Sequence, residues 1–219
     1  MQNHFIKELS NLRCQLCQQG ANVQKAIEQA IQSFSTGDSE RAQQVIEQDK
    51  AIDLEEIRIE EECLKTLALY QPVAGDLRTV ISYIKINTSL ERMADFACHI
   101  AERAINITHH SRQSGQELFD FSPMASHVQD MLHNTLNIVD TGDFIMAHKV
   151  IEQDDAVDAM RNEHRSHAKA AIISNPIAAE YYLDCIGLAR DLERIADLAT
   201  DICQHIIYLR TGFITRHKG

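Results

Sequence analysis

The chain has 219 residues, of which 44% are hydrophobic and 24% are charged, and these proportions are typical of a globular protein with one large or two small cores. Its formal net charge of −11 argues against a general nucleic-acid-binding or anionic-lipid-binding protein, because phosphate groups repel an acidic surface. Such a surface suits cations or a basic partner, although solubility alone would also explain it. No stretch approaches the ~18 apolar residues that cross a bilayer, so no membrane-spanning helix is expected.

Apolar residues recur at helical spacing along most of the chain, and no alternating run typical of a strand interrupts them. This pattern predicts an all-α protein whose first helix ends at Gly37, which suits a left-handed cap, with Asp38 capping the next helix. The predicted helices cover approximately residues 5–34, 39–70, 76–108, 123–139, 143–174 and 178–209. The first residues contain no apolar stretch typical of a signal peptide, so a cytoplasmic location with reduced cysteines is expected.

The second half of the chain repeats the first. Ile46–Asp53 (IEQDKAID) returns 105 residues later as Ile151–Asp158 (IEQDDAVD), and Leu90–Asp95 (LERMAD) returns 102 residues later as Leu192–Asp197 (LERIAD). This spacing is longer than the roughly 20–50 residues of solenoid repeats, so it indicates a duplicated subdomain. We predict two tandem three-helix bundles related by internal duplication, over residues 1–110 and 117–215, with the polar segment 109–116 as the linker.

Each copy carries two pairs of carboxylates spaced four residues apart, which places both members of a pair on one face of a helix. The second helix of each copy carries Asp49 and Asp53, or Asp154 and Asp158; the third carries Glu91 and Asp95, or Glu193 and Asp197. Like charges at this spacing are unfavourable without a cation and favourable with one. All-oxygen donors suit hard ions such as Mg²⁺, Mn²⁺, Ca²⁺ or iron, so we predict metal binding by these eight residues.

Helical geometry predicts where the ions lie. In the third helix of the first copy, Glu91 and Asp95 fall opposite the apolar stripe, and Glu193 and Asp197 stand the same way in the second copy. The metal is therefore expected on the outer surface of the bundle. Two alternatives remain open: a solvated acidic stripe that binds nothing, and a metal-dependent enzyme or metal store on a helical bundle. A di-iron oxidase is disfavoured because no Glu is followed three residues later by His.

Several motifs together resemble the PhoU family of phosphate-uptake regulators. They are the opening His4-Phe5 with its Leu-rich helix, the segment Pro72–Arg78 (PVAGDLR), and the repeated Leu90–Asp95 and Leu192–Asp197. The resemblance covers nearly the whole chain. Ala94 and Ala196 stand where the family commonly has Gly, and we expect little effect because Ala favours helix. The resemblance implies two pseudo-symmetric three-helix bundles, with the eight carboxylates as candidate ligands of iron, zinc, manganese or magnesium.

The resemblance also implies a function that the residues alone do not. Similar proteins are cytoplasmic negative regulators of the phosphate-starvation response, often dimeric, and they connect the ATPase of a high-affinity phosphate ABC transporter to a sensor histidine kinase. They are not enzymes. The residues agree, because the chain has no Gly-rich phosphate loop and no recognisable nucleophile–base motif.

Overall fold

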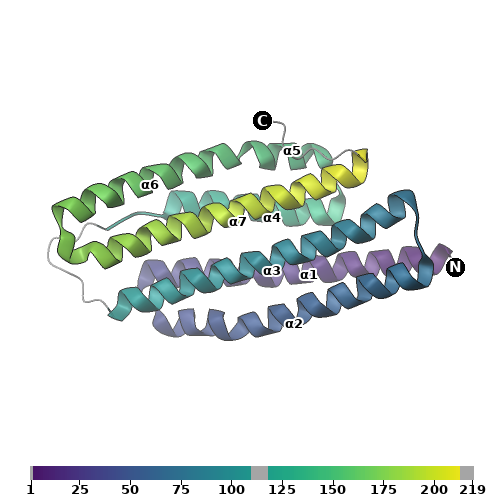
Figure 1. Ribbon diagram of the computed structural model, residues 1–219, viewed down its shortest axis with the longest axis horizontal. Helices are drawn as coiled ribbons and strands as arrows, with labels where there is room; N and C mark the ends of the chain where they lie inside the picture. Colours follow the sequence, from purple (N-terminus) through teal and green to yellow (C-terminus); the bar gives the residue numbers. More distant parts are fainter. Residues whose placement is uncertain (1, 110–117, 213–219) are drawn as a thin grey trace.

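The computed structural model describes residues 2–109 and 118–212, and all regular structure within these ranges is helical, as predicted (Figure 1). The elements are α1 (Gln2–Thr36), α2 (Ser39–Tyr70), α3 (Ala74–His109), α4 (Ser122–Thr141), α5 (Phe144–Glu152), α6 (Asp154–Ser174), the short 3₁₀ helix η1 (Pro176–Ala178) and α7 (Ala179–Thr211). Helices α1–α3 form the first unit and α4–α7 the second.

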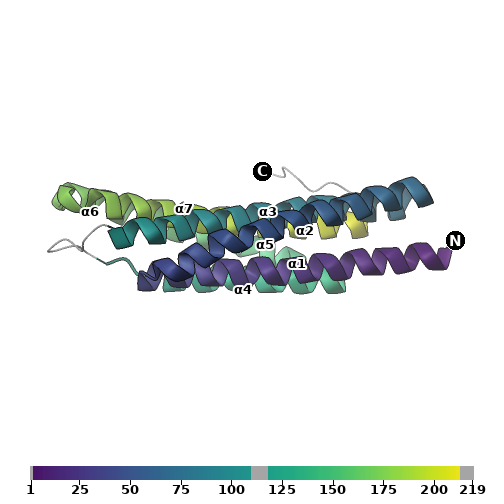
Figure 2. The same cartoon turned by 90° about the horizontal axis from the view of Figure 1, so that it is seen from below.

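The two units lie side by side with their helices along a common direction (Figure 1). Helix α3 of the first unit packs against α7 of the second, and α1 packs against α4. The turned view shows these two contacts in separate layers (Figure 2). Because the last helix of each unit meets its counterpart, the duplicated elements form the centre of the molecule.

The turns between the first and second helices of each unit repeat the same local structure. Gly37 and Gly142 both have φ of 70°, the left-handed conformation that favours glycine at the end of a helix. The side chain of Asp38 accepts a hydrogen bond from the backbone N–H of Arg41, and Asp143 caps α5 in the same way. The predicted caps at Gly37 and Asp38 are confirmed.

The single helix predicted over residues 143–174 is wrong, because the structure divides it into α5 and α6 at Gln153. The backbone N–H of Gln153 donates to the carbonyl of Val150 at 3.1 Å, and Ala156 donates to the Gln153 carbonyl at 3.2 Å. These bonds span three residues and not four, which tightens the chain locally. His127 Nε2 from α4 lies 3.2 Å from the same carbonyl. No glycine or proline marks this break in the sequence.

The core joins the two units into one body. Buried side chains from α1 to α7 form one continuous hydrophobic cluster, in which the predicted stripes on α3 and α7 are buried. These stripes consist of Ile86, Leu90, Met93, Ala97 and Ile100, and of Leu188, Leu192, Ile195, Ala199 and Ile202. The predicted linker lies almost entirely outside the described residues, as do the proposed domain limits at 110, 117 and 215.

Candidate metal-binding site

The first acidic cluster lies between α2 and α3, which pack along one another. Helix α2 contributes Asp49, Asp53 and Glu56, and α3 contributes Glu91 and Asp95. Burial, followed by the charges of the other four carboxylates, raises the pKa of Glu91 to about 7. The structure therefore brings together the four residues predicted for this copy and adds Glu56. Glu56 follows Asp53 by three residues, so helical spacing alone was sufficient to find it.

Asp49 is the innermost carboxylate of this cluster. Burial raises its pKa, as does the charge of Asp53, while a hydrogen bond with the Cys98 thiol acts in the opposite direction. Burial, followed by the charge of Asp49, raises the pKa of Cys98 to about 12, so the thiol stays protonated. Asp49 Oδ1 is buried without a hydrogen-bond partner. An orphaned carboxylate oxygen inside an acidic cluster is an available ligand for a hard cation.

Within the described ranges, no lysine or arginine forms an ion pair with any of these five carboxylates. The nearest pairs along α2 are Arg58 with Glu55 and Lys65 with Glu62, both on other carboxylates. Among the residues that the structure describes, the first cluster therefore has several negative charges and no cationic side chain within ion-pair distance.

The second acidic cluster lies between α6 and α7 and contains the four predicted residues of that copy. Asp154 begins α6, and its pKa is raised to about 6 by burial and then by Asp197 and Asp158. Burial also raises the pKa of Asp197, with Glu193 as the next cause. Because these carboxylates raise one another's pKa values, the four lie close together, as the packing of the two helices was expected to place them.

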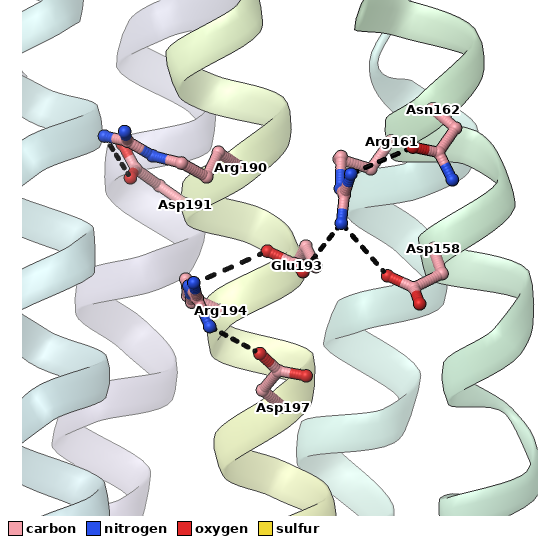
Figure 3. A network of polar contacts seen from close by, with 8 residues as sticks. All are labelled: Asp158, Arg161, Asn162, Arg190, Asp191, Glu193, Arg194 and Asp197. Carbon is pink, nitrogen blue, oxygen red and sulfur yellow. Dashed lines mark hydrogen bonds and ion pairs between the residues drawn. The ribbon is translucent and has the colours of Figure 1, made fainter.

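Two arginines enter the second cluster (Figure 3). Arg161 Nη2 lies 3.1 Å from Glu193 Oε1 and 3.7 Å from Asp158 Oδ1. Arg194 Nη1 lies 3.2 Å from Asp197 Oδ2, and its Nε lies 3.8 Å from Glu193 Oε2. The two clusters thus have matching carboxylates but different charge balance.

The outward orientation predicted for Glu91, Asp95, Glu193 and Asp197 holds for Asp95, which is exposed, but it is wrong for Glu193, which is 9% exposed. Glu91 and Asp197 are half-buried. Helix α7 packs against α3, α4, α5 and α6, so both sides of it are covered. A helical projection places a residue relative to its own helix only, and it does not report which neighbours cover that face.

Among the described residues, no three His, Cys, Asp or Glu side chains are already arranged to hold a metal ion. An ion at either cluster therefore requires side chains to rotate. The donor chemistry of the first cluster fits such an ion, because all its carboxylates lack a cationic partner and one buried oxygen is unsatisfied. Metal binding by the eight predicted residues stays a prediction.

The fold and the clusters define a class: a duplicated helical-bundle protein with an acidic cluster between the last two helices of each unit. Across the described residues, none of the helices combines the length and apolar character that crossing a bilayer requires. The PhoU domain model matches residues 16–104 and again residues 121–206, one match to each unit. The chain belongs to the PhoU family.

Known proteins support this assignment over the whole chain. The phosphate-specific transport system accessory protein PhoU homolog of Aquifex aeolicus is 35% identical, over 98% of this chain and 96% of that protein. The crystal structure of PhoU from Pseudomonas aeruginosa matches with a TM-score of 0.91 and 34% identity, covering 95% of this chain and all of that one. The phosphate transport system regulatory protein PhoU from Streptococcus pneumoniae matches with a TM-score of 0.88 and 25% identity, covering 97% of this chain and 100% of that one.

These relatives are named as accessory and regulatory proteins. The PhoU domain is not an enzyme fold, so the family assignment supports the prediction that the chain is not an enzyme.

Proposed function

We propose that this protein is an accessory regulator of phosphate transport that restrains phosphate uptake and the phosphate-starvation response. The observation that carries the proposal is the match of both three-helix units to the PhoU domain, in a chain that spans nearly the full length of relatives named for phosphate-specific transport. A match confined to one unit would show only that this unit has the PhoU bundle fold, and it would not support a common function for the whole chain.

The proposed mode of action is that of a cytoplasmic adaptor. It docks on the ATPase of a high-affinity phosphate ABC transporter and on a sensor histidine kinase, and it reaches the membrane only through them. Its net charge of −11 favours basic patches on such partners, because complementary charge accelerates and orients docking. We also propose that the protein forms a homodimer.

We further propose that the first acidic cluster binds a divalent or trivalent cation such as iron, zinc, manganese or magnesium. Asp49, Asp53, Glu56, Glu91 and Asp95 would hold it, and the ion would supply the positive charge that these residues lack. Because α2 and α3 each contribute ligands, a bound cation would link the two helices and relieve the repulsion between their carboxylates. A docking surface that includes these helices becomes more rigid when the cation is present.

The decisive experiment measures a phosphate-starvation reporter in cells that lack this protein. We expect the reporter to be active even at high phosphate, and the wild-type gene to restore its repression. A reporter that stays repressed at high phosphate in the absence of the protein would contradict the proposed regulation.

The partner and metal parts are tested separately. Affinity capture from cells with a tagged transporter ATPase or histidine kinase should retain this protein, and light scattering should give twice the mass of one chain. Elemental analysis with and without chelator should show metal that Asp49→Asn with Glu91→Gln removes. The exposed variant Glu61→Gln, which lies on α2 outside the cluster, is the matched control.

A further inference from the structure

We propose that Arg161 fills the second acidic cluster as a built-in cation, so that this cluster takes no metal ion and only the first cluster remains open to one. This inference rests on the metal part of the proposed function for the first cluster, but the behaviour of Arg161 can be tested independently. It departs from the symmetric pair of sites that the duplicated carboxylates predict.

The position of the guanidinium carries the argument. Arg161 lies on α6 one turn after Asp158, and its Nη2 bridges Asp158 and Glu193 at 3.7 and 3.1 Å (Figure 3). It therefore joins α6 to α7 through one carboxylate of the cluster from each helix. Its Nη1 donates to Asn162 Oδ1 at 2.9 Å, which holds the planar group in position.

Burial strengthens this contact. The Arg161 side chain is 26% exposed and the Glu193 side chain 12%, so solvent screens their attraction less than it does at an open surface. Arginine keeps its charge at all relevant pH values, and its fork matches carboxylates. An incoming divalent cation would have to displace this guanidinium and would be repelled by it.

The first copy lacks this arrangement because Glu56 occupies the position 105 residues before Arg161. Arg161 contacts Asp158 and Glu193, and these two carboxylates correspond to Asp53 and Glu91 in the first copy. The carboxylates are therefore matched, and the position of Arg161 is the one that changes sign, from arginine to Glu56. Arginine follows the third-helix Glu in both copies, which means that the difference between the clusters lies at Glu56 and Arg161. The duplication has therefore produced one cluster balanced by its own side chain and one that is not.

The test is Mn²⁺ binding to chelator-stripped protein, with free Mn²⁺ followed by electron paramagnetic resonance. In the otherwise unchanged chain, Asp49→Asn with Asp53→Asn should abolish Mn²⁺ binding. Asp154→Asn with Asp158→Asn should leave the number of Mn²⁺ ions bound per chain unchanged. Arg161→Glu should add about one bound Mn²⁺ per chain, and adding Asp154→Asn with Asp158→Asn should remove it. The reciprocal Glu56→Arg should abolish binding at the first cluster.

The outcomes separate this inference from the proposed function. If the wild type binds no Mn²⁺ but Arg161→Glu binds one through Asp154 and Asp158, the role of Arg161 in the second cluster stands and the metal part of the proposed function for the first cluster fails. If the wild type loses bound Mn²⁺ on Asp154→Asn with Asp158→Asn, or if Arg161→Glu gains none, the inference is overturned. If circular dichroism shows that Arg161→Glu does not fold, Arg161→Met takes its place, because it also removes the guanidinium. The asparagine variants are expected to fold, since asparagine relieves the repulsion between neighbouring carboxylates.

Discussion

Arg103 in α3 donates from Nε to Asp191 Oδ2 in α7 across 3.0 Å, and this ion pair joins the two duplicated units. The Asp191 side chain is fully buried and that of Arg103 is 22% exposed. Arg103 Nη1 also lies 3.5 Å from Oδ1 of Asp184, which is on α7 like Asp191. In the repeat, His205 occupies the position that matches Arg103, and Ser89 occupies the position that matches Asp191. The duplication therefore does not provide a second, symmetry-related arginine–aspartate pair.

Breaking this pair should destabilise the whole protein and not one unit. Arg103→Met leaves the Asp191 carboxylate buried without its main partner, which costs about 3 kcal/mol of unfolding free energy. The double variant Arg103→Met with Asp191→Leu should recover most of the loss, because the fully buried carboxylate at position 191 is gone. Urea denaturation followed by circular dichroism measures both. Arg190→Ala is the control, since the Arg190 side chain is 61% exposed and lies 3.7 Å from Asp191; a loss as large as that of Arg103→Met would contradict this account.

Gly187 leaves the space in which the Arg103 guanidinium lies. A Cβ at position 187 would come within 2.2 Å of Arg103 Cζ, so the guanidinium would have to shift. We expect Gly187→Ala to cost about 2 kcal/mol in the wild type, less than the full loss of the pair because the shifted guanidinium, at the end of a flexible side chain, still partly balances the Asp191 charge. In the Arg103→Met, Asp191→Leu background the same change should cost much less, since the guanidinium is gone and alanine favours helix. The two urea midpoints give this coupling directly, and equal costs in both backgrounds would refute it.

The repulsion around Glu91 makes stability depend on pH. Its folded-state pKa of about 7 lies above the ordinary glutamate value of 4.5, so the folded protein binds the extra proton and wild-type stability falls as pH rises from about 4.5 to 7. In metal-free buffer, Glu91→Gln should gain about 1 kcal/mol at pH 8 once solvent screening is allowed for, and only a small part of that at pH 5, where the loss has just begun. Urea midpoints at the two pH values check this. A gain that is equal at both pH values would show that the effect is not electrostatic.

Ala74 begins α3 with φ of 48°, a left-handed conformation that costs a residue with a Cβ about 1–2 kcal/mol. Ala74→Gly should therefore stabilise the protein by about 0.5 kcal/mol, after the greater freedom of glycine in the unfolded chain is subtracted. The reverse control is Gly142→Ala at φ 70°, where a Cβ meets nothing within 4 Å, so its expected loss of about 1 kcal/mol comes from the backbone alone. Thermal unfolding measures both, and a destabilising Ala74→Gly would contradict the left-handed conformation.

The helices, their ends and the duplication follow from the sequence. Apolar spacing and the Gly37–Asp38 cap act within a few residues, so they can be read locally. The carboxylate pairs are equally local, because residues four apart on a helix share a face whatever surrounds it. The break at Gln153 was missed because His127, which contacts its carbonyl, comes from another helix.

The charge balance of the two clusters was decided by tertiary structure. The sequence contains Arg161 and Glu193 but does not say that α6 and α7 place the guanidinium on that carboxylate. Likewise, the burial of Glu193 depends on four neighbouring helices, and the Arg103–Asp191 pair depends on the rotation of α3 against α7. The sequence by itself determines which residues share a helix face, because backbone geometry is local. Which faces meet is decided only when the helices pack, because that depends on the burial of the whole core.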